Sequence, residues 1–445
     1  MKMKVLKFGG TSVGTPESIE NVKNITLGQE GRKLLVLSAM SGVTNELVAI
    51  SNLSKTQNYT EIEVIIEKLR DRHFLAIDRL IQEEILNQET KSFVGKCLQD
   101  LSVAGHKAYT DAVYAEIVTY GETMLTFMVS QYFKAQGIEN IWLDAKEFME
   151  VHNLENPDTD RVGKLLDAHL QGKRSDLYIT QGFVCINRHN EISTLKRGGS
   201  DYTATILGAA AQASEVQIWT DIDGFHNNDP RHVEGTHPIS ELTFEEAAEL
   251  AYFGAKILHP QTVSPVINKG IPIFLKNTFT PEKTGTKISS EVHSKGLKAI
   301  AAKDDITAIK IKSNRMLMAH GFLRKIFDVF NHYETSIDMI TTSEIAISLT
   351  IDDTRNLDKI LEELNAYGEI TVDRNQSIVC IVGESVIEDQ STYKLFELLN
   401  DIPVRMISYG GSSNNISILV DTQDKIKTLR TLNQKLFSEG LSQLV

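Results

Sequence analysis

Short apolar runs and long amphipathic stretches alternate through the first part of the chain. Residues 34–42 (LLVLSAMSG) and 177–186 (LYITQGFVCI) are nearly continuous apolar runs, which are typical of buried strands. Between them, residues 61–135 repeat apolar side chains at helical spacing. Strands that alternate with helices predict an α/β sandwich with a mostly parallel sheet.

The helical stretch is amphipathic, so one of its faces is expected to be buried. The residues on that face are Ile62, Ile66, Leu69, His73, Ile77, Leu80 and Ile81.

The pattern changes near residue 300, where two similar units follow each other. Each reads as strand, helix, strand, strand, helix, which is a ferredoxin-like repeat. The first unit closes with a strand at 369–374, whereas the second ends in GLSQLV, a poor strand. A spare strand at 298–303 precedes both units, and we expect it to complete the second one, so that the two units intertwine.

The expected domains are therefore residues 1–295, 296–375 and 376–445. A chain of 445 residues is long enough for two or three cores. The net charge of −13 argues against nucleic acid or an anionic membrane as a partner.

Cysteine usage and the chain's N-terminal pattern predict a cytoplasmic protein. Cys97, Cys185 and Cys380 are far apart without metal-ligand spacing, which predicts neither a disulfide framework nor a zinc site. The first lysines are not followed by an apolar region, so no signal peptide is expected. No apolar run is long enough to span a membrane.

Two glycine pairs lie beside cations where a helix is expected to begin. KFGGTSVG, residues 7–14, follows an apolar strand, and KRGGSDYTA, residues 196–204, comes after an expected hairpin turn. Glycine lets backbone N–H groups approach a ligand closely, and a helix N-terminus favours an anion. Both motifs therefore indicate anion binding.

Two further motifs belong to the same picture. WTDIDGFHNNDPR (219–231) places aspartates and an arginine in one loop, and FGAKILHP (253–260) places a lysine after a helix. Each motif alone is compatible with an ordinary turn or a solvated loop. Together, at the ends of alternating elements, they predict one pocket for a polyphosphate and a carboxylate. The P-loop pattern and the GxGxxG fingerprint are both absent.

These motifs, with LSAMSGVTN and YGE between them, resemble the successive signatures of aspartate kinase, and the doubled C-terminal unit resembles the paired ACT domains of that family. The resemblance extends over essentially the whole chain. It implies an amino acid kinase-type three-layer αβα sandwich followed by two regulatory ACT domains. It also implies transfer of the ATP γ-phosphoryl group, with Mg²⁺, to the β-carboxylate of L-aspartate.

The resemblance also implies roles for individual residues. The catalytic residues would be Lys7, Lys256 and Asp201. The aspartate pocket would be formed by Ser38, Thr44, Glu122, Arg197, Ser200 and Asp201. The nucleotide would contact Lys7, Phe8, Gly9, Gly10, Thr220, Asp221, His226, Arg231 and Lys256.

Residues 314–344 resemble the effector loop of lysine-inhibited aspartate kinases, and a dimer or tetramer through the ACT domains is expected. The implied effector residues are Met316, Ala319, Gly321, Phe322, Leu323, Asp338, Ser343 and Glu344. Asp338 and Glu344 would hold ammonium groups. Ala319 stands where the lysine-sensitive pattern has a hydroxyl residue, so threonine, or no effector, remains an alternative to lysine.

Other functions compete with this interpretation. Another carboxylate kinase of the same fold, of the glutamate or carbamate type, usually lacks paired ACT units and KFGGTSVG. A fusion to homoserine dehydrogenase is disfavoured because no dinucleotide fingerprint is present. A non-catalytic amino-acid sensor is the alternative from another class, and aspartate-dependent ATP consumption separates it from a kinase.

Overall fold

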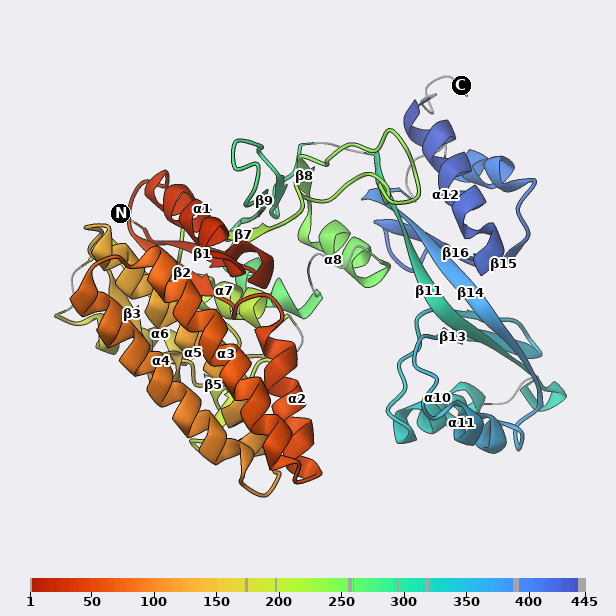
Figure 1. Ribbon diagram of the computed structural model, residues 1–445. Coiled ribbons are helices and arrows are strands. Elements are labelled where there is room, and N and C mark those ends of the chain that lie inside the picture. Colours follow the sequence, from red (N-terminus) through yellow and green to blue (C-terminus); the bar gives the residue numbers. More distant parts are fainter. Residues whose placement is uncertain are drawn as a thin grey trace. The chain divides into compact units, whose positions relative to one another are not determined.

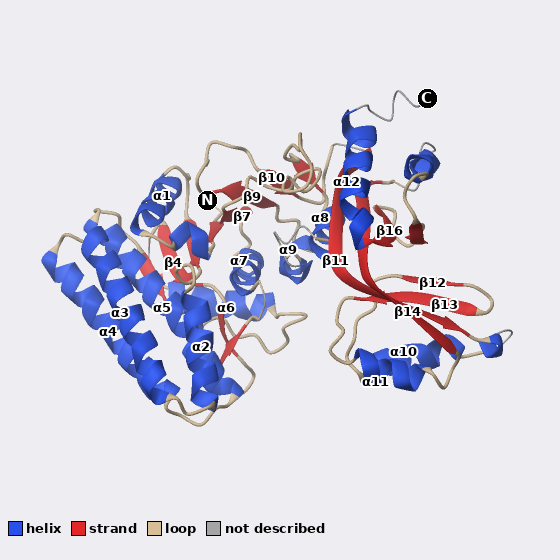
Figure 2. Cartoon of the chain, turned by 45° about the vertical axis from the view of Figure 1, so that its right-hand side comes forward, coloured by secondary structure: helices blue, strands red, loops and turns tan. Residues whose placement is uncertain are grey.

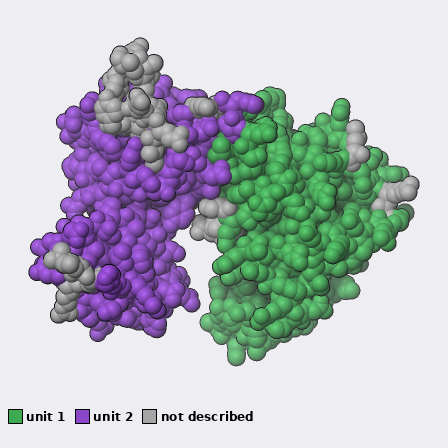
Figure 3. Space-filling view, turned by 180° about the vertical axis from the view of Figure 1, so that it is seen from behind, with its two compact units in different colours: residues 1–225, 240–244, 258–291 green, residues 226–239, 245–257, 292–445 purple. Residues whose placement is uncertain are grey.

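The computed structural model describes residues 2–172, 175–196, 198–254, 258, 260–293, 296–316, 320–386 and 392–438. The chain forms two compact units, shown in separate colours in Figure 3. The first unit comprises residues 1–225, 240–244 and 258–291, and the second comprises residues 226–239, 245–257 and 292–445. Two segments that precede residue 295, 226–239 and 245–257, thus group with the C-terminal part of the chain.

The first unit is built on a sheet with the strand order β3-β4-β2-β1-β7-β9-β10-β8. The strands are β1 (Lys4–Phe8), β2 (Lys33–Leu37), β3 (Ile141–Leu143), β4 (Leu177–Gln181), β7 (Glu215–Thr220), β8 (Glu241–Leu242), β9 (Ile273–Asn277) and β10 (Thr286–Ile288). Neighbouring strands are parallel except β9 and β10. β5 (Val184–Ile186) and β6 (Ile192–Thr194) form a separate hairpin.

Helices cover both faces of this sheet, as Figures 1 and 2 show. They are α1 (Pro16–Leu27), α2 (Val43–Lys55), α3 (Tyr59–Leu80), α4 (Glu84–Gly105), α5 (Asp111–Ala135), α6 (Thr159–Leu170), α7 (Gly199–Ala210) and α9 (Ser264–Ile267), with short 3₁₀ turns η1 (Gly10–Val13), η2 (Ala145–Glu147) and η3 (Pro260–Thr262). Among the helices that the structure describes, none combines the length and apolar character that a membrane crossing requires.

The apolar pattern of the strands explains this layered packing. In β1, Leu6 and Phe8 belong to the core formed with α1 and α3–α5. Val5, which points to the other face, is also fully buried, and α7 packs against β1. A strand buried on both faces is what a nearly continuous apolar run predicts. The predicted α/β sandwich is confirmed, and all residues of the predicted helix face are buried.

His73 is a polar exception within that helical core. Its ring is completely buried, Nδ1 lies 2.7 Å from the Leu69 carbonyl oxygen, and Nε2 has no hydrogen-bond partner among the described residues. Burial lowers the pKa of His73 to about 4. The folded protein therefore holds this ring neutral where the unfolded chain would protonate it.

This burial should make stability depend on pH. Because the folded pKa lies below the unfolded value, stability is fully present above about pH 6.5 and is lost as pH falls towards 4. Wild type should lose about 3 kcal/mol more free energy of unfolding between pH 7 and pH 4 than a His73→Leu variant. Urea unfolding at both pH values measures this difference, and parallel losses in the two proteins would contradict it.

The second unit contains a sheet with the order β12-β13-β11-β14-β16-β15, in which all neighbours are antiparallel. Its strands are β11 (Gly296–Lys312), β12 (Ile340–Thr342), β13 (Ala346–Ile351), β14 (Glu369–Glu384), β15 (Val404–Ser408) and β16 (Asn415–Asp421). Its helical segments are α8 (Phe244–Tyr252, grouped here from residue 245), η4 (Asn314–Met316), α10 (Phe322–His332), α11 (Leu357–Leu364), η5 (Thr392–Leu399), η6 (Thr422–Asp424), α12 (Lys425–Asn433) and the π turn η7 (Gln434–Ser438).

Two long strands run through both halves of this sheet. Residues 308–312 of β11 pair with 369–373 of β14, and residues 299–303 pair with 378–382. The spare strand therefore lies beside the first strand of the second repeat and continues into the first repeat. Positive φ angles at Asp305 (62°) and Asn375 (57°), together with register shifts, mark the change from one half to the other.

Each half of the sheet has its own core. α10 and α11 pack with β13 and the C-terminal end of β11. On the other half, η5 and α12 pack with β14 and β16, and this core includes Val233 from the segment 226–239.

Candidate active site

A cleft of about 520 Å³ opens where several strands of the first unit end. It is lined by Gly9, Gly10, Thr11, Ser38, Ala39, Met40, Ser41, Gly42, Thr44, Asn45, Glu122, Phe183, Gly199, Ser200, Thr220 and Asp221. Most of these residues follow β1, β2 and β7, whose carboxyl ends share one edge of the parallel sheet. Open α/β sheets bind ligands at this edge.

Lys7 and Asp201 form an ion pair that links two of the sequence motifs. Lys7 Nζ lies 2.6 Å from Asp201 Oδ1, and the two side chains are only 10% and 15% exposed. Lys7 belongs to β1 and Asp201 to the first turn of α7. A Cβ atom at Gly9 would lie 3.3 Å from Lys7 Nζ, so the small residue leaves the ammonium group its space.

Glu122 supplies a buried carboxylate to the same cleft. It lies on α5 and is 3% exposed, and its Oε1 accepts a hydrogen bond of 3.2 Å from the Ala39 backbone N–H. Oε2 is buried without a hydrogen-bond partner among the described residues. Burial raises the pKa of Glu122 to about 8. A cationic ligand would stabilise the charged form that the protein alone disfavours.

Close packing fixes the cleft residue Ser200, and the sequence motifs did not indicate this packing. The hydroxyl groups of Ser38 and Ser200 are hydrogen-bonded at 2.9 Å. A Cβ at Gly182 would lie 2.5 Å from the Ser200 side chain, so only glycine fits beside it. The next residue, Phe183, lines the cleft with a left-handed backbone (φ 70°) and donates its N–H to Thr203 Oγ1 at 2.8 Å. A glycine inside the apolar run 177–186 was the available signal.

The glycine loop is tied to the neighbouring strand edge. Ser12 Oγ and Thr278 Oγ1 are 2.7 Å apart and buried, which links η1 to the residue after β9. The Phe8 side chain is fully buried and stacks with Trp219 at a centroid distance of 5.9 Å. Phe8 was predicted to contact the nucleotide, but its side chain belongs to the core, so only its backbone is left for a ligand.

Thr220 and Asp221 lie at the rim of the cleft after β7. The Thr220 hydroxyl donates to Asp221 Oδ1 at 3.1 Å, and Asn277 Nδ2 donates to the Asp221 carbonyl oxygen at 3.2 Å. Among the described residues, no group of His, Cys, Asp and Glu side chains is arranged as a metal site. Mg²⁺ bound with a nucleotide needs only one or two carboxylates besides the phosphates, and Asp221 fits this role.

The other two residues predicted for the nucleotide loop belong to the second unit. Arg231 binds both carboxylate oxygens of Asp229, with Nη2 2.7 Å from Oδ2. Burial alone would raise the pKa of Asp229, but hydrogen bonds from Arg231 hold this pKa below its ordinary value. His226 Nδ1 lies 3.3 Å from Thr236 Oγ1. Both residues therefore have partners within the second unit.

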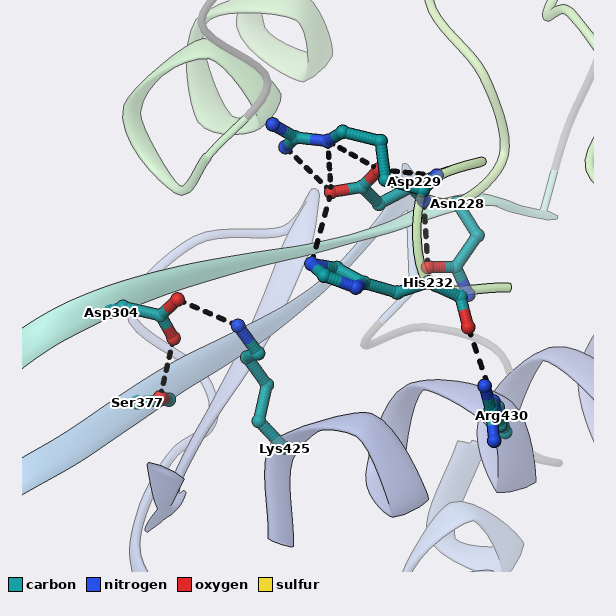
Figure 4. Close-up of polar contacts among 8 residues, drawn as sticks. Asn228, Asp229, His232, Asp304, Ser377, Lys425 and Arg430 are labelled. Atoms are coloured by element: carbon teal, nitrogen blue, oxygen red, sulfur yellow. Dashed lines mark hydrogen bonds and ion pairs between the residues drawn. The ribbon is translucent and has the colours of Figure 1, made fainter. Parts of the chain in front are cut away.

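The loop that carries Arg231 is anchored on α12. Asn228 Nδ2 donates to the Leu429 carbonyl oxygen and to Asn433 Oδ1, each at 3.3 Å. Figure 4 shows Arg430, whose Nε donates to the His232 carbonyl oxygen at 3.1 Å. These contacts explain why 226–239 groups with the second unit.

Three predicted residues, Arg197, Lys256 and Ala319, lie outside the described residues. Thr44 lines the cleft together with Ser38 and Ser200.

The predicted effector residues all lie in the second unit. Gly321 precedes α10 with φ 77°, which suits glycine, and Phe322 is buried against Tyr367. Met316 packs partly buried against the same core, whereas Leu323 is 39% exposed. Ser343 bonds the Ala346 carbonyl oxygen, and Glu344 is exposed. The Asp338 carboxylate is bound by Lys303 and Tyr252 through Oδ1.

Comparisons with known proteins agree with this geometry. The amino acid kinase family model matches residues 2–277, and an ACT domain model matches residues 379–436. Lysine-sensitive aspartokinase 3 of Escherichia coli (strain K12) is 32% identical, over 97% of this chain and 99% of its own. Aspartokinase 2, chloroplastic, of Arabidopsis thaliana is 33% identical, over 97% of this chain and 84% of its own.

Solved structures are similar over the whole chain as well. The E. coli aspartokinase III complex with aspartate and ADP, in the R-state, has a TM-score of 0.83 at 31% identity and covers 98% of this chain and 100% of that one. The complex of that enzyme with lysine and aspartate, in the T-state, has a TM-score of 0.82 at the same identity of 31%, and the coverage is again 98% and 100%. The chain therefore belongs to the amino acid kinase family and, within it, to the aspartokinases.

Proposed function

We propose that this protein transfers the γ-phosphoryl group of ATP to the β-carboxylate of L-aspartate and forms 4-phospho-L-aspartate, the first step towards lysine, threonine and methionine. The proposal is carried by the cleft at the carboxyl edge of the sheet, which is lined by Gly9, Glu122 and Ser200. The ion pair of Lys7 and Asp201 joins the two chain segments that supply Gly9 and Ser200 to this cleft. The named relatives support it, since both are aspartokinases and the match to this chain covers 99% and 84% of their lengths.

The chemistry explains why no general base is needed. An aspartate side chain with a pKa of about 4 is already a nucleophile at neutral pH. One of its carboxylate oxygens forms the new bond to the γ-phosphorus, the bond from that phosphorus to the bridging oxygen breaks, and ADP leaves with the electron pair. The protein has to neutralise repelling anions and to hold the reactants in line.

The residues of the cleft fit these tasks. Lys7 would neutralise the transferring phosphoryl group, with Asp201 holding the ammonium group in place and the backbone amides of Gly9 and Gly10 adding hydrogen bonds. Glu122 would accept the substrate ammonium group, and Ser38, Thr44 and Ser200 would line its pocket. We assign Arg197 to a substrate carboxylate and Lys256 to the nucleotide phosphates, as the resemblance implies. Mg²⁺ would screen the phosphate charge when it is bound beside Asp221.

We further propose feedback inhibition by lysine, a homodimer or tetramer through the ACT domains, and a cytoplasmic location. The domains that we propose are residues 1–295, 296–375 and 376–445, with the two regulatory domains intertwined through β11 and β14. The relative solved with lysine and aspartate supports the regulatory part.

Aspartate-dependent ADP formation, with trapping of the acyl phosphate as its hydroxamate, tests the activity. We expect ADP release with L-aspartate, little with L-glutamate, and inhibition by L-lysine. Release that depends on L-glutamate would favour another carboxylate kinase. Binding of amino acids without ADP formation would favour the sensor. A parallel titration with L-threonine distinguishes the two effectors.

A further inference from the structure

Helix α8 presents three polar side chains at three-residue intervals: Glu246, Glu249 and Tyr252. This spacing places them along one side of the helix, and each one contacts another part of the second unit. Glu246 Oε2 lies 2.7 Å from Lys298 Nζ on β11, with side chains that are 0% and 5% exposed.

The second contact involves the other half of the regulatory sheet. Glu249 accepts hydrogen bonds from Ser412, which lies three residues before β16, and from Asn415, the first residue of β16. Burial nevertheless raises the pKa of Glu249. α8 is thus attached both to the long strand β11 and to the second repeat.

The third contact is made to Asp338, in the first repeat. The Tyr252 hydroxyl donates to Asp338 Oδ1 at 2.5 Å, and Lys303 Nζ lies 2.9 Å from the same oxygen. Lys303 Nζ also lies 4.1 Å from the centroid of the Tyr252 ring and 2.9 Å from Asp352 Oδ2. One carboxylate therefore holds a helix side chain and a strand side chain together.

Asp338 has capacity for a further donor. Its side chain is 0% exposed, and Oδ2 is buried without a hydrogen-bond partner among the described residues. Burial raises the pKa of Asp338 despite the donors at Oδ1. The group that Lys303 offers is an alkylammonium, the same chemical group that an amino acid would present.

We propose that Asp338, Lys303 and Tyr252 form a clasp that holds α8 to the second unit, and that the ammonium group of an amino-acid effector opens it by taking the Asp338 carboxylate. The inference rests on the proposed function, which supplies the amino-acid effector. It deepens that function by naming the contact that the effector changes.

Opening the clasp would act on the chain that follows α8. That chain turns at Gly254, where φ is 129° and a Cβ would lie 2.0 Å from the Ala302 carbonyl oxygen. Two residues later it reaches Lys256, and it rejoins the first unit at residue 258. An effector that binds better when the clasp is open shifts the population towards that state.

Hydrogen exchange of the α8 amides in the full-length protein tests the clasp without any assay of activity. Tyr252→Phe keeps the ring and removes only the hydroxyl. A hydrogen bond to a charged group is worth enough to change the opening equilibrium roughly tenfold or more. We expect α8 to exchange about tenfold faster in this variant. Tyr367→Phe is the matched control, because the Tyr367 ring contacts Phe322, at a centroid distance of 6.4 Å, and Tyr367 is not part of the clasp.

The ligand arm uses L-lysine, L-threonine and L-methionine as probes. In wild type, at least one should accelerate α8 exchange. In Tyr252→Phe, calorimetry should show that same amino acid binding about tenfold more tightly, because its competitor for Asp338 is weakened. Tighter binding combined with looser α8 is a signature that a merely structural hydroxyl would not give.

Three results overturn the proposal. They are unchanged α8 exchange in Tyr252→Phe, unchanged or weaker amino-acid binding in that variant, and no probe that affects α8 in wild type. Failure of the proposed function is seen separately, as an absence of aspartate-dependent ADP formation, and it leaves these exchange measurements interpretable.

Discussion

Lys7→Ala is expected to lower kcat about 100- to 1,000-fold while the KM for aspartate changes little, because the lost ammonium group acts mainly on charge that develops in the transition state. The wild-type side chain is fixed by Asp201 at 2.6 Å and is shielded from solvent, so its electrostatic effect is stronger than it would be in water. Steady-state kinetics with ATP and aspartate varied independently measures both parameters.

Controls separate this effect from a loss of folding. Lys4→Ala removes a lysine from the other end of the same strand, where it pairs with Glu215 at 3.3 Å, and should keep wild-type kcat. Because Lys7→Ala leaves Asp201 without its cation, Lys7→Met with Asp201→Asn removes both charges and should be equally slow. Wild-type turnover in Lys7→Ala would show that Lys7 does not act on the transferring phosphoryl group.

The affinity for aspartate should depend steeply on pH through Glu122. The free protein holds this carboxyl with a pKa of about 8, so most molecules carry it protonated at neutral pH. Ammonium binding requires the carboxylate, and so the KM for aspartate should fall about tenfold for each pH unit as pH rises from 6 towards 8, and level off above. Initial rates across this range measure the profile.

Glu122→Gln should raise the KM for aspartate by about 10- to 100-fold at pH 8.5, which is the cost of a lost charged hydrogen bond. Below pH 7 the difference from wild type should shrink, because wild type is then neutral at this position as well. Glu116→Gln, on the same helix but paired with Lys107 near the surface, should keep the wild-type profile. A pH-independent KM in wild type would show that Glu122 does not bind the ammonium group.

Much of the fold was accessible from sequence because it follows from local patterns. The apolar runs that became β2 and β4, and the amphipathic face of α3, are periodic over many residues. The internal repeat could be recognised from the sequence, but the sequence pattern divided each long strand of the structure into two. Two pairs of predicted strands are joined into β11 and β14, each bent where one residue has positive φ.

The site could be predicted from the sequence only where motif residues lie at the ends of strands that share one edge of the sheet. Lys7 of β1 pairs with Asp201 of α7, and Glu122 of α5 lines the cleft together with Gly9 and Ser200 from the same two motifs. The partners of Arg231 and Asp338 were missed, because they depend on contacts that no local pattern encodes. Tyr252 and Asp338 are 86 residues apart, and Asn228 and Asn433 are 205 apart.

The grouping of residues 226–239 and 245–257 with the second unit has a consequence for engineering. A hybrid enzyme that exchanges regulation between two relatives by splicing at residue 295 would leave both segments behind, facing surfaces with which they did not coevolve. Transplanting the sensing half would therefore require three pieces of sequence, two of which are embedded in the region that the catalytic family model covers.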